Sequence, residues 1–177
     1  YKKNRIIKNE GIHTVLMTQQ DRSQPSIVEF EIIKKIMDQV LGCKFIDFDK
    51  KQIELIGVEA GGPKKSKLHA APLSRNAKIG ILHGAASYVC QNNEGQINDT
   101  ESISAGLDYP GVSPIHCFLK DTKRARYTFA TDEEALSAYK LVTKFEKLNP
   151  SLEPSHAFAE AIKIAPKLSK DCLLYTS

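Results

Sequence analysis

Residues 53–58 read Ile-Glu-Leu-Ile-Gly-Val, and Gly61, Gly62 and Pro63 follow shortly after them. This run is too apolar for a strand with one face in water, and it is short enough to be a strand. Glycine and proline then interrupt the pattern, as they do where a chain leaves a sheet. The stretch therefore predicts a buried strand of a parallel sheet, with helices covering both faces.

Helical periodicity appears on both sides of this strand. Apolar residues recur at spacings of three and four over residues 25–41, where Pro25 suits the start of a helix. Thr131 and Glu134 form a capping box, which predicts a helix from there to about Leu148. The expected buried stripe of that helix is Ala135, Ala138, Tyr139, Val142 and Phe145.

A further helix is expected from about Ser155, which would cap it, to Pro166, which would end it. Its expected apolar face is Ala157, Phe158, Ala161, Ile162 and Ala165. The alternation of helix and strand signals favours a layered α/β fold. The stretch 105–114 fits neither period, because it holds two glycines, two prolines and Asp108. We interpret it as a structured loop of the kind that often carries function.

The composition limits the class of protein. The chain has 177 residues, 41% of them hydrophobic, which predicts one globular domain or part of one. Its net charge of +4 comes from charges of both signs spread along the chain, so nucleic-acid binding is not expected. No stretch is apolar enough for a membrane span, and residues 1–10 are charged where a signal peptide would be apolar.

The four cysteines predict neither a zinc site nor a disulfide framework, because they lie far apart and form no CxxC pair. A reducing compartment is the simpler interpretation, and the cytoplasm is the expected location. They are Cys43, Cys90, Cys117 and Cys172.

Several motifs occur along the chain in one order and spacing. They are LIGVEAGG (55–62), Leu82-His83-Gly84, Gly95-Gln96-Ile97, SISAGLDYPGV (102–112), TDEEAL (131–136) and LEPSHA (152–157). In these motifs the chain resembles the tryptophan synthase β-chain family. The string at 102–112 disfavours other enzymes of the same fold type, such as serine or threonine dehydratases and cysteine synthases. Before Ile53 the resemblance is looser.

The resemblance implies the three-layer αβα sheet of the fold type II pyridoxal-phosphate enzymes, incomplete in this chain. Residues 1–171 would be part of the carboxy-terminal domain, and residues 172–177 are a candidate non-native tail. The family joins L-serine and indole into L-tryptophan through pyridoxal phosphate. An α subunit and a second β chain would be the partners. The location would be a plastid if the source is a plant.

The resemblance also implies roles for three residues around the loop. Asp108 would contact the serine-derived substrate and act in catalysis, and Gly106 would lie with its backbone against the cofactor. Glu153 would lie beside the pyridoxal ring and act in both cofactor binding and catalysis. The alternatives are an Asp that stabilises its own loop, a plain turn glycine, and a first-turn Glu that favours the helix dipole.

Four further positions follow from the resemblance. Tyr109 and Gly111 would bind a monovalent cation, Na⁺ or K⁺, through their backbone carbonyls, which suit hard cations. Leu82 and His83 would line the tunnel through which indole passes. A half-buried aromatic and a structural histidine are the alternatives for Tyr109 and His83. Glu59 follows the buried strand at the edge where ligands of α/β sheets usually lie.

Two parts of the family's chemistry have no match here. No lysine can be assigned to the cofactor's Schiff base, and residues 38–45 hold one glycine where a GGGSN phosphate loop would be expected. The interpretation is therefore a fragment that is inactive by itself. The alternative from another class is a non-catalytic binding module, or a dead subunit, that pairs with an α subunit.

Overall fold

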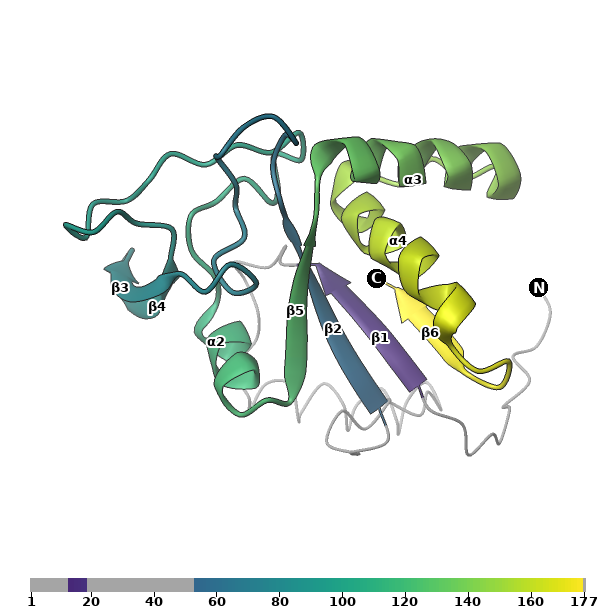
Figure 1. Ribbon diagram of the computed structural model, residues 1–177, viewed down its shortest axis with the longest axis horizontal. Coiled ribbons are helices and arrows are strands. Elements are labelled where there is room, and N and C mark those ends of the chain that lie inside the picture. Colours follow the sequence, from purple (N-terminus) through teal and green to yellow (C-terminus); the bar gives the residue numbers. More distant parts are fainter. Residues whose placement is uncertain (1–12, 19–52, 177) are drawn as a thin grey trace, which may run out of the picture.

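This computed structural model describes residues 13–18 and 53–176. Four parallel strands form one sheet in the order β5-β2-β1-β6 (Figure 1). The predicted strand is β2, and it lies inside the sheet between β1 and β5, so the prediction of a buried parallel strand is confirmed. The strands are β1 (His13–Thr18), β2 (Ile53–Ala60), β5 (Ala125–Ala130) and β6 (Leu173–Thr176).

Helices cover both faces of this sheet, so the α/β class with three layers is confirmed. Side chains of β2 alternate between the two faces, as a strand requires. Ile56 and Val58 pack under α3 (Asp132–Glu146) and α4 (Leu152–Ile164). Ile53 and Leu55 pack on the other face with Leu119 of α2 (Pro114–Asp121).

The capping box at the start of α3 is formed as predicted. The Thr131 hydroxyl accepts the Glu134 N–H at 3.3 Å, and the Glu134 carboxylate accepts the Thr131 N–H at 2.8 Å. Lys147, in the left-handed conformation with φ of 59°, ends the helix. The predicted stripe is wrong at Phe145, which is 66% exposed because the last turn of α3, residues 144–146, is exposed on all sides.

The start of α4 differs from the prediction. The helix begins at Leu152, with Ser151 as its N-cap, so Ser155 lies inside the first turns and donates its hydroxyl to the Ser151 carbonyl at 2.7 Å. The predicted face is wrong at Ile162 and Ala165, which are exposed. Small and polar residues take the buried face because α4 packs closely between the sheet and α3. They include Ser155, His156, Ala159 and Glu160.

A hairpin that the sequence analysis did not predict stands apart from the sheet, beside α2 (Figure 1). It consists of β3 (Lys78–Leu82) and β4 (Ala85–Val89). His83 and Gly84 form the two-residue connection, with positive φ of 51° and 82°. A type I′ hairpin turn needs this conformation at both positions, and glycine adopts it readily.

Two other expectations concern the ends of the chain. The helix predicted at 25–41 lies outside the described residues. Residues 173–176, within the candidate tail, form β6 and pair in parallel with β1. None of the described helices has the length and apolar character of a membrane span.

Candidate functional site

The loop that the sequence analysis singled out lies between β4 and α2 in the chain and packs against the carboxyl ends of β2 and β5. The Gly61 N–H donates to the Ala130 carbonyl at 2.7 Å, and the Asp132 N–H donates to the Gly62 carbonyl at 3.1 Å. Helices α3 and α4 both begin at this edge (Figure 1). Ligands of open α/β sheets usually bind here, outside the carboxyl ends of the strands.

Gly106 and Glu153 meet at this edge. The Gly106 N–H donates to Glu153 Oε1 at 3.1 Å, although the two residues are 47 positions apart. A Cβ added to Gly106 would lie 2.8 Å from the same oxygen, so only glycine allows this approach. The Glu153 carboxylate is thus the neighbour of the Gly106 backbone.

Glu153 is held in its ionised form. Burial raises the pKa of its carboxyl, but its own N–H, the nearby hydroxyls of Ser104 and Ser151, and the Gly106 N–H lower the pKa further than burial raises it. Glu153 stands in the first turn of α4, where a negative charge is also favourable. The site therefore presents a carboxylate next to the loop.

Asp108 occupies the exposed side of the same loop. The N–H groups of Leu107 and Asp108 both donate to the Ser104 carbonyl at 3.0 Å, which closes a tight turn. Leu107 is 3% exposed and packs with Ala60 and Ala70, so it anchors the turn to the end of β2. The anchor leaves the Asp108 side chain open to a ligand.

The predicted tunnel residues and the predicted cation-binding residues lie together. The Tyr109 hydroxyl is 2.6 Å from His83 Nδ1, and their rings are 5.7 Å apart. A Cβ added to Gly111 would lie 2.7 Å from Leu82 Cδ2, so the hairpin packs closely against the loop. His83 is exposed and sits in the hairpin turn, whereas Leu82 is 9% exposed.

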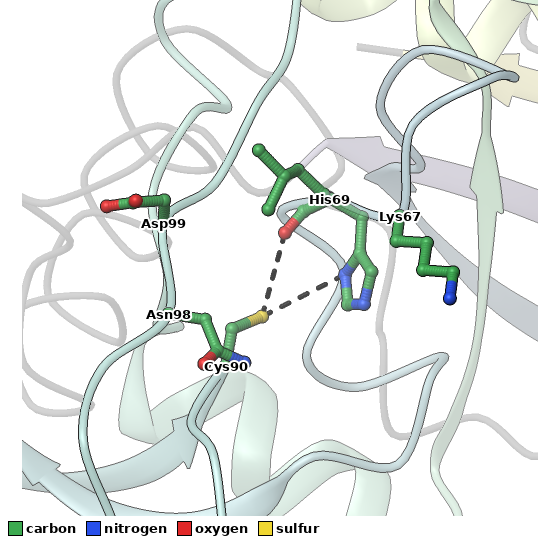
Figure 2. A pocket seen from close by; sticks show the side chains of 6 residues that line it. Lys67, His69, Cys90, Asn98 and Asp99 are labelled. Atoms are coloured by element: carbon green, nitrogen blue, oxygen red, sulfur yellow. Dashed lines mark hydrogen bonds between the residues drawn. The ribbon is translucent and has the colours of Figure 1, made fainter.

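A pocket of about 380 Å³ opens beside the loop (Figure 2). Cys90 and His69 face one another in it, with the Cys90 Sγ 3.9 Å from His69 Nδ1. The backbone N–H of Cys90 donates to the Pro110 carbonyl at 2.7 Å, which ties the pocket to the loop. The lining residues are Lys67, Leu68, His69, Cys90, Asn98 and Asp99.

This thiol and imidazole are not an activated nucleophilic pair. Burial raises the pKa of Cys90 to about 11, and burial also lowers the pKa of His69. Both groups are therefore neutral near pH 7, whereas a reactive cysteine needs a thiolate. The sequence analysis missed this pair because its members lie 21 residues apart. Among the described residues, no cluster of His, Cys, Asp and Glu is arranged to hold a metal ion.

Glu59 is fully buried at the carboxyl end of β2. Its carboxylate accepts the Leu73 N–H at 3.0 Å and both the N–H and the hydroxyl of Ser74 at 2.6 Å. Burial raises its pKa to about 7, although these hydrogen bonds and the charge of Lys120 oppose the rise. Glu59 thus holds the turn at 71–77, and its hydrogen bonds point into the protein.

Comparison with known proteins adds two relatives. The chain is 52% identical over 120 residues to the tryptophan synthase β chain of Chromobacterium violaceum, covering 67% of this chain and 30% of that protein. It is 50% identical over 125 residues to the tryptophan synthase β chain of Bordetella petrii, and this match covers 70% of this chain and 31% of that protein. The chain thus spans just under a third of the length of these relatives. No family model matches it.

The fold is similar to that of a solved structure. The crystal structure of T.th. threonine deaminase matches 92% of this chain and 46% of its own, with a TM-score of 0.50 and 13% identity. This likeness supports the α/β fold of the fold type II pyridoxal-phosphate enzymes, seen here in part. The motifs and the two curated relatives agree on a narrower group: the chain belongs to the tryptophan synthase β-chain family.

Proposed function

We propose that this chain supplies the substrate-side loop of a tryptophan synthase β chain, which joins L-serine and indole into L-tryptophan with pyridoxal phosphate. One observation carries the proposal. The loop at 104–112 and the first turn of α4, which belong to two separate motifs, are joined by the hydrogen bond from Gly106 to Glu153 at the ligand-binding edge of the sheet.

The described residues fit one side of the cofactor. Glu153 offers an ionised carboxylate and Gly106 a backbone without a Cβ, and the family resemblance would place both beside the pyridoxal ring. When bound, the cofactor supplies the electron sink that stabilises the substrate carbanion. The sequence contains neither a GGGSN phosphate loop nor a lysine that can be assigned to the cofactor. This chain alone is therefore proposed to be inactive.

The other roles follow from the loop. Asp108, exposed beside the anchored Leu107, would bind and orient the polar side chain of the serine substrate. The backbone carbonyls of Tyr109 and Gly111 would hold Na⁺ or K⁺. Leu82 and His83 would border the path of indole, because the hairpin packs against this loop. An α subunit and a second β chain would be the partners.

The test compares this chain with a full-length β chain that contains it. We expect the full-length protein to form L-tryptophan from L-serine and indole, and the variant Asp108→Asn to lower kcat/KM for L-serine by roughly tenfold or more. A substitution at Asp171, which is also exposed but lies outside the loop, serves as the control. Full activity of the Asp108→Asn variant would contradict its role.

The same experiment on this chain alone tests its proposed inactivity. After incubation with pyridoxal phosphate and gel filtration, we expect no cofactor absorbance to stay with the protein. Retained absorbance together with tryptophan formation would show that the missing loop and lysine have replacements in this chain.

A non-catalytic binding module is the second candidate, and the absence of the phosphate loop and of an assigned lysine favours it. Such a module should retain a purified tryptophan synthase α subunit in a pull-down. The control is Ile56→Asp, which places a charge at a fully buried position of the core and should unfold the chain. Equal retention by the folded chain and this variant would count against specific binding.

A further inference from the structure

We propose that Asp132 is a buried positioning residue that, together with Glu153, fixes the loop at 103–108, and that His156 is the partner of Asp132. The inference rests on the proposed function, because this loop carries Asp108. The sequence analysis gave neither residue such a role: Asp132 appeared only within the TDEEAL motif, and His156 only within the LEPSHA motif.

Asp132 joins three segments of the chain. It is the first residue of α3 and is 8% exposed. Its N–H donates to the Gly62 carbonyl at the end of β2, and its Oδ2 accepts the N–H of Ile103 at 3.1 Å. A single residue thus ties the end of the central strand and the start of the loop to the helix.

Glu153 holds the same loop at a second point. Its Oε1 accepts the Gly106 N–H at 3.1 Å, so two carboxylates in the first turns of α3 and α4 hold two N–H groups three residues apart. Ser104 lies between these N–H groups and is fully buried. Charge-assisted hydrogen bonds of this kind are about twice as strong as neutral ones, so the loop is fixed at two points.

His156, on α4, lies close enough to Asp132 for the charge of each residue to act on the pKa of the other. It is fully buried, and its Nδ1 lies 2.8 Å from the Leu152 carbonyl. A carbonyl can only accept, so Nδ1 carries the proton. Nε2 of His156 and Oδ1 of Asp132 are both buried, and neither has a hydrogen-bond partner among the residues that the structure describes.

The two unpaired atoms are chemically complementary. A proton on Nε2 gives the imidazole a donor for Asp132 Oδ1, whereas the neutral ring offers only an acceptor. Burial lowers the pKa of His156, and the Leu152 carbonyl and the charges of Asp132 and Glu153 oppose this. Burial raises the pKa of Asp132, and the negative charges of Glu133 and Glu101 raise it further. The hydrogen bond from Ile103 and the charge of His156 lower this pKa, but by less. The charges of Asp132 and His156 thus each favour the ionised form of the other.

The test measures amide hydrogen exchange at Ile103 and Gly106 in a full-length β chain that contains this segment. Asp132→Ala removes the acceptor of the Ile103 N–H, and we expect exchange at Ile103 to become roughly 10- to 100-fold faster, as for the loss of a hydrogen bond to a charged group. Asp132→Asn keeps an oxygen acceptor and should retain most of the protection at Ile103.

Glu133→Ala is the matched control. Glu133 is the next residue of α3, and its carboxylate holds the Lys64 N–H of a different loop at 3.1 to 3.2 Å. This variant should speed exchange at Lys64 and leave Ile103 unchanged. If Asp132→Ala leaves exchange at Ile103 unchanged, the positioning role of Asp132 is overturned.

His156→Asn tests the pairing, because its amide can still donate to the Leu152 carbonyl but has no group at the place of Nε2. We expect the effects of His156→Asn and Asp132→Asn on exchange in the loop to be non-additive in a double-mutant cycle. Additive effects would show two independent structural residues. The ¹⁵N shift of His156 Nε2 should also change in Asp132→Asn, and an unchanged shift would equally rule out the pair.

Activity is measured separately, so that the two proposals fail in distinguishable ways. Asp132→Ala, which removes the acceptor that holds the start of the loop, should lower kcat/KM for L-serine by several-fold, since this loop carries Asp108. If exchange behaves as expected but no wild-type tryptophan synthesis occurs, the pair stands and the proposed function is wrong.

Discussion

Glu59 is a carboxyl group enclosed in protein, and its titration should appear in the stability of the whole chain. The folded form holds the proton up to about pH 7, whereas an unfolded glutamate releases it near 4.5. Because the folded form binds the proton more tightly, its stabilising effect is present below pH 4.5 and is lost as the pH rises to about 7. At about 1.4 kcal/mol per pKa unit, the loss is about 3 kcal/mol.

The substitution Glu59→Gln removes this titration. We expect the free energy of unfolding of Glu59→Gln, relative to wild type, to rise by about 3 kcal/mol between pH 4.5 and pH 8, measured by urea unfolding at each pH. Glu54→Gln, at an exposed position of the same strand, is the control because it removes no buried charge. Parallel pH curves for wild type and Glu59→Gln would contradict the expectation.

At the scale of single residues, the sequence could suggest the site only through the motifs. They pointed to Gly106 and Glu153, which the structure brings into contact. Neither spacing nor composition signals that Asp132 reaches Ile103 or that His69 faces Cys90, because these contacts depend on how the chain folds back on itself. The roles of Asp108, Tyr109 and Gly111 remain predictions.

The capping box is the element-level feature with the clearest energetic consequence. Thr131→Ala removes the hydroxyl that accepts the Glu134 N–H, and we expect it to lower the free energy of unfolding by about 1 kcal/mol. Urea unfolding monitored by circular dichroism measures the change. Thr131→Ser keeps the hydroxyl and should stay close to wild type; a serine variant as unstable as the alanine variant would point to lost methyl packing instead.

Helix α3 could be predicted because its start has a chemical signal, whereas the start of α4 has a weaker one. Ser151 occupies the N-cap of α4 without a side-chain hydrogen bond, so Ser155 was the more obvious cap in the sequence. The buried face of α4 was also predicted wrongly in part, because the polar residues His156 and Glu160 are buried while Ile162 is exposed. Periodicity finds a helix by its apolar residues and fails where small and polar residues are buried.

Across the whole molecule, the end of α3 leaves an apolar stripe in water. Leu141 and Phe145 are 41% and 66% exposed, and their spacing of four places them on one side of α3. Leu148, 62% exposed, follows directly after the helix. We expect Phe145→Lys to reduce self-association of the chain, measured by gel filtration over a concentration series, with a change in stability within about 0.5 kcal/mol.

Ser137→Lys is the matched control for this stripe. It adds the same charge at an exposed position of the same helix and removes no apolar surface. Equal elution of the two variants would show that net charge, rather than the stripe, governs association.

The overall architecture was predictable from β2 and the helices around it, because a continuous apolar strand needs cover on both faces. The order of the strands in the sheet could not be predicted, because strands that pair with one another are far apart in the sequence. The hairpin carries a usable signal in His83-Gly84, a two-residue connection that ends in glycine. The sequence analysis used that motif only for the family resemblance.

The pairing of β1 with both β2 and β6 has a consequence for the order in which the sheet can assemble. The register places His13 beside Ile53 on one side and beside Leu173 on the other. On the ribosome, the second edge of β1 must therefore wait until the chain has been synthesised through β6. Contacts this distant slow folding, and until β6 arrives the nascent chain exposes a strand edge to which chaperones or other chains can bind.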